Sequence, residues 1–533
     1  MKHSTNTSSF WSRMTMTAVL LTVGFGAAFA QGFWPDYDFR AVNPDGDTLY
    51  YRITSSTAPY TVAVTRCHDS VYHTLPWPQN ATQVGQPGFL YPVYDYDSLI
   101  TIPSTVAYNG TTYTVTSIDK EAFFMQKDLH TVIIPASVET IDTGAFCASS
   151  LHNIVMPNVK RINYYAFCMT PSLSHVDLPS CLTYLGEMAF LYSAISEVDV
   201  PAGVTVLPYQ SFYRCPLTKI TLHEGLEEIL EDAIPPTYLD SIVFPGTLRK
   251  LALGNPYLID PYDPTSDILC HYVEFKPSTN PLELYDHCFY GFSHLTSISL
   301  PVNTVKLGKS CFANSGIEQI TIPSSIDTIP ENCFAECSTL FHVVLPQQLV
   351  SIGTRAFSQT PLLKEIDIPA TVTYIGKRAF IGNNGESGLE FINCYCEVPP
   401  VISGSGLQPT FSTSDTIYVR VPCGKTAAYQ SASGWSSYSN LIYEECVGVE
   451  ERESAEFKVY PNPANEVLYV ELDGAGIKSV VLYDLQGRVV MGVCDTPQQG
   501  IAAINVRSVP AGVYVLRVTD ENGREYHRKV VVK

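Results

Sequence analysis

The sequence predicts a mainly β protein: a solenoid of parallel β-sheet rungs of 22–23 residues, followed by a small antiparallel β-sandwich. Three observations predict this fold class. Short apolar segments end in proline at a fixed spacing, a small residue followed by Phe recurs about ten residues later, and the last part of the chain alternates apolar and polar residues between glycines. The composition agrees, because 33 Tyr, 33 Gly and 37 Pro suit strands and turns better than helices.

The prolines mark the repeat. Each closes the pattern L-x-x-I-x-I-P, as in residues 129–135 and 317–323, and the unbroken steps are 22 or 23 residues. A strand that alternates between core and solvent, and ends at a residue that cannot donate to the ladder, forms one rung of a parallel sheet. One rung cannot bury its own apolar face, so the rungs must stack around one core. The prolines are Pro135, Pro157, Pro179, Pro201, Pro245, Pro301, Pro323, Pro346 and Pro369.

The small residue and Phe that follow are expected to return the chain on the other side of the core. Cys288, Cys311 and Cys333 fill the position that Ala fills in other rungs, which favours buried and inert thiols among the 15 cysteines. A disulfide between cysteines of neighbouring rungs is the alternative, because disulfides persist in an oxidising compartment outside the cytoplasm. The pairs 333/337 and 394/396 lack the spacing of a zinc site.

Two segments carry a family resemblance. Ile352-Gly353-Thr354-Arg355-Ala356-Phe357 and residues 375–380 resemble the units of BspA-like leucine-rich repeats of the Treponema pallidum type, which read I-G-x-x-A-F and then L-x-x-I-x-I-P. The resemblance implies a solenoid with a C-terminal capping module over residues 96–445. Before it, strand-like segments at residues 50–53 and 60–64 indicate an N-terminal β cap region over 31–95. Two rungs depart from the pattern, because His223 replaces a strand-ending proline and an insert from Gly254 to Asp267 lengthens one step.

The end of the chain is expected to form a separate unit. Residues 446–456, rich in Glu, indicate a linker. Residues 457–533 open with Val459-Tyr460-Pro461-Asn462-Pro463-Ala464 and resemble the Por (type IX) secretion system C-terminal sorting domain of Bacteroidetes. That resemblance implies that the type IX machinery is a partner and that the chain crosses the outer membrane. It also implies that this domain is usually removed, and that the rest is released or attached to surface lipopolysaccharide.

Residues 1–30 are typical of a signal peptide, with Lys2 and Arg13 before an apolar stretch and with cleavage expected between Ala30 and Gln31. The alternative is a membrane anchor. The apolar stretch holds about a dozen residues, whereas a transmembrane helix needs roughly twenty. We therefore expect no transmembrane segment in the mature chain.

Charge and motifs exclude several function classes. The net charge of −20 argues against nucleic acid as a partner. The sequence has no GxSxG, HExxH, Walker or strand-following GxGxxG motif, so we expect neither catalysis nor a cofactor.

Two places are candidate binding sites. On neighbouring rungs His175, Asp177, Glu197 and Asp199 occupy outward positions and should share one face. One interpretation is a solvated acidic surface whose negative charge is partly compensated by Lys219 and screened by salt. The alternative is a site for a divalent cation or a cationic ligand. The second place is the insert, with Tyr257, Asp260, Tyr262 and Asp263, which is either a tolerated surface loop or a binding loop.

These observations leave two functions open. The first is a secreted or surface-attached binding protein, an adhesin that contacts host proteins, other cells or glycans. The second is a non-catalytic structural component of the cell envelope. The resemblance to the repeat family favours the first, although a fold does not fix a function.

Overall fold

The computed structural model describes residues 37–66, 72–74, 90–92, 96–254, 268–381, 388–403, 409–411, 417–444, 457–472, 476–484, 488–494, 501–521 and 524–533. They are mainly β, with about 3% helix. The chain separates into two compact units, one of residues 1–421 with 425–443 and one of 422–424 with 444–533. The signal peptide and the linker that the sequence predicts lie outside the described residues, and the predicted domain boundaries stay predictions.

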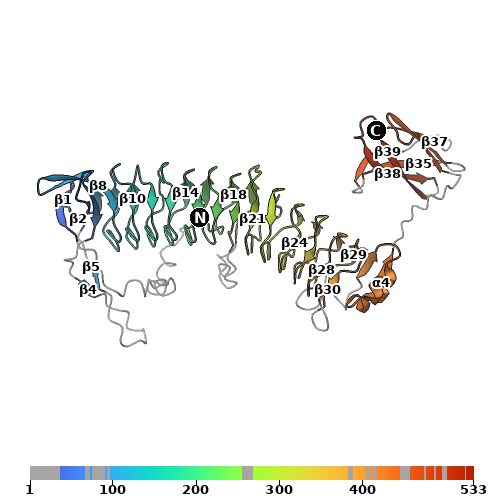
Figure 1. Cartoon of the computed structure of the whole chain (residues 1–533), viewed down its shortest axis with the longest axis horizontal. Coiled ribbons are helices and arrows are strands. Elements are labelled where there is room, and N and C mark those ends of the chain that lie inside the picture. The colour runs from blue at the N-terminus through green and yellow to red at the C-terminus, as the bar shows by residue number, and fades with distance from the viewer. Residues whose placement is uncertain are drawn as a thin grey trace, which may run out of the picture. The chain divides into compact units, whose positions relative to one another are not determined.

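The first unit is a parallel β-solenoid of about 13 turns, as the sequence predicts (Figure 1). Most turns contribute one strand at the L-x-x-I-x-I position, and paired strands run parallel with residues one repeat apart lying opposite each other, as in Glu197↔Lys219. We call the outward side of these strands the strand face. The strands are β6 (Leu99–Thr101), β9 (Thr131–Ile133), β11 (Asn153–Val155), β14 (Glu197–Val200), β16 (Lys219–Leu222), β18 (Ser241–Phe244), β20 (Tyr272–Phe275), β23 (Gln319–Thr321), β25 (His342–Val344), β27 (Glu365–Ile368), β29 (Phe391–Cys394), β31 (Tyr418–Val421) and β32 (Ile442–Glu444).

Two turns have no full strand at this position. His175 and Ser297 each form an isolated bridge, to Glu197 and Gln319 respectively. The parallel register therefore continues through both turns.

A second row of shorter strands forms where each turn reverses, which the proline pattern alone does not predict. These strands pair in parallel within three successive groups, β8 to β13, β15 to β22 and β24 to β30, as in Ile141↔Ile162. They are β8 (Thr111–Ile118), β10 (Thr140–Ile141), β12 (Arg161–Ile162), β13 (Tyr184–Leu185), β15 (Val206–Leu207), β17 (Glu228–Ile229), β19 (Lys250–Leu251), β21 (Leu282–Leu284), β22 (Thr304–Lys306), β24 (Thr328–Ile329), β26 (Ser351–Ile352), β28 (Tyr374–Ile375) and β30 (Val401–Ile402).

The repeated Phe residues form a stacked spine inside the solenoid. Phe146 and Phe167, for example, have ring centroids 5.3 Å apart and planes 3° apart, and both side chains are fully buried. The backbone N–H of Phe146 donates to the carbonyl of Ala166 on the next turn, so a ladder of hydrogen bonds runs beside the rings. The spine has two runs, Phe123–Phe146–Phe167–Phe190–Phe212 and Phe289–Phe312–Phe334–Phe357–Phe380–Phe411.

The described cysteines confirm the prediction of buried thiols in the repeat. Cys288, Cys311 and Cys333 are free and fully buried beside the spine. Burial raises the pKa of the Cys215 thiol to about 12 and that of Cys337 to about 11. Such thiols stay protonated near neutral pH and are poor nucleophiles. Cys423, by contrast, is disulfide-bonded.

An antiparallel cap covers the first turns. Strands β1 (Phe39–Val42), β2 (Thr48–Ser55) and β3 (Thr61–Thr65) pair in order, and β3 joins β8 in parallel. Strands β7 (Thr105–Tyr108) and β8 form the hairpin that the dipeptide Asn109-Gly110 predicts, and both turn residues have positive φ. Two further strands, β4 (Tyr72–Thr74) and β5 (Leu90–Pro92), pair with each other.

The last turns end in helix α4 (Thr426–Ser431) and the 3-10 helix η1 (Trp435–Leu441). Trp435 is fully buried and its ring lies 5.4 Å from that of Phe411, so it closes the spine. Its indole N–H donates to the carbonyl of Pro400 at 2.8 Å. The large indole ring of Trp435 therefore covers the end of the apolar core, and its N–H group is not left as an unpaired buried donor.

The second unit has two antiparallel sheets around its own core, which confirms the predicted antiparallel fold. One sheet has the order β33-β34-β37 and the other β36-β35-β38-β39. Apolar residues alternate inward along β38, where Tyr514, Leu516 and Val518 are buried. The strands are β33 (Phe457–Tyr460), β34 (Val467–Leu472), β35 (Ile477–Tyr483), β36 (Val489–Cys494), β37 (Ile501–Asn505), β38 (Gly512–Asp520) and β39 (Glu525–Val532).

Candidate functional site

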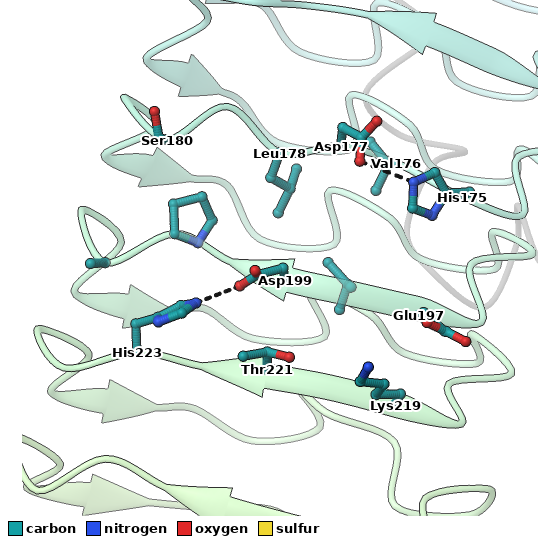
Figure 2. Close-up of a pocket in the computed structure, with 13 residues that line it drawn as sticks. His175, Val176, Asp177, Leu178, Ser180, Glu197, Asp199, Lys219, Thr221 and His223 are labelled. Carbon is teal, nitrogen blue, oxygen red and sulfur yellow. Dashed lines mark hydrogen bonds and ion pairs between the residues drawn. The ribbon is translucent and has the colours of Figure 1, made fainter.

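A groove of about 500 Å³ lies on the strand face over three consecutive turns (Figure 2). Its floor and walls come from the turn of His175, from β14 and from β16. We call it the rung groove. It is lined by His175, Val176, Asp177, Leu178, Ser180, Glu197, Val198, Asp199, Pro201, Ala202, Lys219, Thr221 and His223.

Alternation along the strands decides which side chains line the groove. In β14, Val198 and Val200 are buried in the core, so Glu197 and Asp199 must point outward. Parallel pairing without a shift in register places His175 beside Glu197 and Glu197 beside Lys219. The repeat therefore gathers polar groups from three turns that are 22 residues apart in the sequence.

Two histidine–aspartate pairs dominate the polar surface of the groove. His175 Nε2 lies 3.0 Å from Asp177 Oδ1 on the same turn. His223 Nε2 lies 2.6 Å from Asp199 Oδ1 on the preceding turn, and Figure 2 shows the two side chains pointing toward each other. Each aspartate thus has a histidine beside it, while Glu197 lies in register between His175 and Lys219.

The side chains of both aspartates are largely exposed to solvent. The Asp177 side chain is 92% exposed and that of Asp199 is 70% exposed. Ion pairs at such exposure contribute about 0–1 kcal/mol to stability, so the pairs are not what holds the solenoid together. Their carboxylate oxygens face solvent and can accept hydrogen bonds from a ligand.

The structure brings together all four residues that the sequence places on this face. His175, Asp177, Glu197 and Asp199 line one groove. Among the described ranges, no three His, Cys, Asp or Glu side chains are grouped so that they could hold a metal ion. The choice between a cation site and a solvated acidic surface stays a prediction.

The groove is completed by His223 and Thr221, which the sequence analysis did not assign to a binding site. The signal was present, since His223 replaces the proline that ends the other strands. What the sequence does not show is that its ring reaches back across the turn to Asp199.

The other sequence-predicted sites lie outside the described residues. These are the insert residues Tyr257, Asp260, Tyr262 and Asp263, and the cleavage site between Ala30 and Gln31. In the part of the chain that the structure describes, no helix is both long and apolar enough to span a membrane.

Stacked turns of 22 or 23 residues, a parallel sheet on one side and a Phe spine within define a leucine-rich-repeat solenoid. Residues 112–252 and 270–386 match the BspA type leucine rich repeat region in six copies, and residues 458–533 match the secretion system C-terminal sorting domain. The chain is therefore a protein of BspA-type leucine-rich repeats that carries a type IX sorting domain. That domain indicates secretion across the outer membrane to the cell surface or beyond.

Two solved structures of bacterial repeat proteins match this chain over most of their own length. A leucine-rich repeat protein from Bacteroides ovatus is 24% identical with a TM-score of 0.47, and the match covers 69% of this chain and all of that one. A leucine rich cell surface protein from Faecalibacterium prausnitzii is 21% identical with a TM-score of 0.40, over 69% of this chain and 96% of that one.

A curated relative matches over a short stretch only. The endo-acting ulvan lyase of Formosa agariphila is 30% identical over 80 residues, which are 15% of this chain and 15% of the lyase. The chain thus matches only a small part of the length of that enzyme, whereas leucine-rich-repeat proteins are usually non-catalytic.

Proposed function

We propose that this protein is a non-catalytic binding protein, an adhesin that acts outside the cell and holds its ligand in the rung groove. The observation that carries the proposal is the groove itself, a concavity on the strand face whose polar side chains, such as Asp177 and Asp199, point outward and are not part of the core. A surface that served only to cover the core would need no concavity there.

The charge of the groove indicates the kind of ligand. Asp177, Glu197 and Asp199 supply three carboxylates, against the single ammonium group of Lys219. A ligand that presents ammonium or guanidinium groups, such as the basic surface of a host protein, complements this pattern. The histidines supply further donors and acceptors to orient it.

The alternative is a structural component of the cell envelope. Such a component would use the solenoid as a spacer, and its strand face could carry any soluble residues. The two functions make different predictions for substitutions in the groove, because only a binding protein depends on those side chains.

The test is binding of the purified full chain to immobilised extracellular matrix proteins, host cells and bacterial glycans, measured by biolayer interferometry. A variant with Asp177→Asn and Asp199→Asn should bind its ligand roughly tenfold more weakly, since loss of two charged contacts costs about 1–2 kcal/mol. Its melting temperature should not change, because both side chains are exposed.

A variant with Glu318→Gln and Asp327→Asn is the matched control. It removes the same charge from exposed positions outside the groove. Equal weakening by both variants would mean that binding depends on net charge and not on the groove. Absence of selective, saturable binding to every probe would favour the structural role.

A further inference from the structure

The last turns of the solenoid carry an aromatic row on the strand face. Phe391 on β29, Tyr418 on β31 and Tyr443 on β32 come from consecutive strands of one sheet, and Phe391 pairs in register with Tyr418. Their exposed fractions are 41%, 45% and 37%, so each ring is more than half covered yet open on one side. Most other turns place a polar residue at the same position, for example Glu197, Lys219 or Gln319.

The three rings form one continuous row in which each ring lies beside the next. Those of Phe391 and Tyr418 have centroids 5.7 Å apart and planes 22° apart. Two rings in direct face-to-face contact would lie about 3.5–4.0 Å apart, so these are displaced sideways and overlap only in part. The Tyr443 ring is turned by 78° relative to that of Tyr418, at a centroid distance of 6.4 Å.

A second row, of polar groups, runs beside the aromatic row. Asp367, Asn393 and Arg420 are in-register partners on β27, β29 and β31, two residues along each strand from the first row. The Asn393 amide donates to Glu365 Oε1 at 2.6 Å and to Asp367 Oδ1 at 2.7 Å, which holds both carboxylates in place. On the other side of the aromatic row, Lys364 and Glu390 form an ion pair at 3.2 Å.

An aromatic row one side chain wide between two polar rows fits a particular kind of ligand. A protein partner is best held by a broad apolar patch, and about 800 Å² on each side is typical. A sugar ring has apolar C–H faces and a rim of hydroxyl groups, so a glycan chain needs a narrow apolar track with hydrogen-bonding groups along its edge. The C–H groups of such a ring carry slight positive charge and are attracted to the negative face of an aromatic ring.

We propose that the aromatic row and the polar row beside it, at the C-terminal end of the strand face, form a binding site for a neutral polysaccharide chain. The sugar rings lie on Phe391, Tyr418 and Tyr443, and their hydroxyl groups bond to the exposed carboxylates of Asp367 and Glu365, which the buried Asn393 holds in place. Glu365 and Asp367 outnumber Arg420 in the two rows, so the site favours a neutral chain over one that carries sulfate or uronic acid groups. The proposal rests on the proposed function only in taking the strand face as the side that binds, and it does not depend on the rung groove.

The test is native affinity electrophoresis of the full chain in gels that contain laminarin, hydroxyethyl cellulose or amylose, with hyaluronan as the anionic comparison. At least one neutral glucan should retard the chain. The variant with Phe391→Ser and Tyr418→Ser should lose at least tenfold in affinity. Tyr418→Phe keeps the ring and should bind within about twofold of the parent chain, which keeps the test valid if the double variant is destabilised.

Tyr272→Ser is the matched control. Tyr272 is an aromatic residue at the same outward position on β20 and is 54% exposed, but it lies outside the aromatic row. It should leave the retardation unchanged. The proposal is overturned if none of the three glucans retards the chain, if only hyaluronan does, or if the double variant binds as tightly as the parent. It is also overturned if the double variant loses binding to a protein ligand while no glucan binds.

Substitutions can test the rung-groove proposal and the polysaccharide-site proposal independently of each other. The variant with Phe391→Ser and Tyr418→Ser should bind the rung-groove ligand as the parent does, and the variant with Asp177→Asn and Asp199→Asn should be retarded by the glucan as the parent is. Loss of glucan binding in the groove variant would show that the aromatic row is not the site.

Discussion

Removal of one ring from the Phe spine tests how the solenoid is held together. Phe312 is fully buried, and its ring lies 5.4 Å from that of Phe289 and 5.3 Å from that of Phe334, with planes 8° and 2° apart. Truncation of a buried Phe to Ala costs about 3–5 kcal/mol, including the cavity that is left. Because the ring stacks on both sides, and each aromatic pair adds about 0.5–1.5 kcal/mol, we expect Phe312→Ala to fall in the upper part of that range.

The assay is urea unfolding of the purified full chain, followed by far-UV circular dichroism. Phe312→Leu keeps most of the buried volume and should cost about half as much as Phe312→Ala. Phe341→Ala is the control, since Phe341 lies just before β25 and is 50% exposed, so its loss should cost no more than about 0.5 kcal/mol. If Phe312→Ala lowers the free energy of unfolding by no more than the control does, the spine is not a stabilising feature and the reasoning is wrong.

Three further predictions follow from other parts of the chain. Deletion of residues 457–533 should leave the protein in the periplasm, and surface labelling that still detects it outside the cell would contradict this. Gly316→Ala would place a Cβ 2.0 Å from the backbone oxygen of Ser293, so we expect a loss of about 1–3 kcal/mol in urea unfolding, whereas Gly492→Ala, where the nearest atom lies at 4.0 Å, should cost little. Burial raises the pKa of Cys215 from 9.0 to about 12, so the folded chain holds this proton more tightly than the unfolded chain; stability should fall as pH rises from 9 to 12, and less steeply in Cys215→Ala.

The regular part of the fold could be predicted because every turn repeats the same two requirements. A proline must end a strand, and a small residue must precede the Phe on the returning segment, so the sequence could place Phe167 and Phe190 at the same position of successive turns. That their rings stack is a finding of the structure. The second row of strands, such as β10 and β12, carries only two residues per turn, which is too short for alternation to reveal.

The candidate site could be predicted only in part, for a related reason. Register fixes which residues lie side by side, and this placed Asp177 and Asp199 on one face. It does not fix where a side chain turns, so the contact from His223 back to Asp199 depends on a rotamer that no pattern encodes. The repeat pattern does not predict the aromatic row, because Phe391, Tyr418 and Tyr443 lie in turns whose spacing departs from 22 or 23 residues.

The separation between buried and outward positions of each strand has a consequence for how such a protein can change over generations. In β14 and β16, Val198 and Leu222 are buried in the core, whereas Glu197 and Lys219 face solvent. Substitutions at outward positions cost little stability, so they can accumulate without passing through unfolded variants. Duplication or loss of a whole turn preserves the stacking on both sides, because each turn contacts only its neighbours. The same scaffold can therefore acquire new ligands, and present altered epitopes, while its core stays fixed.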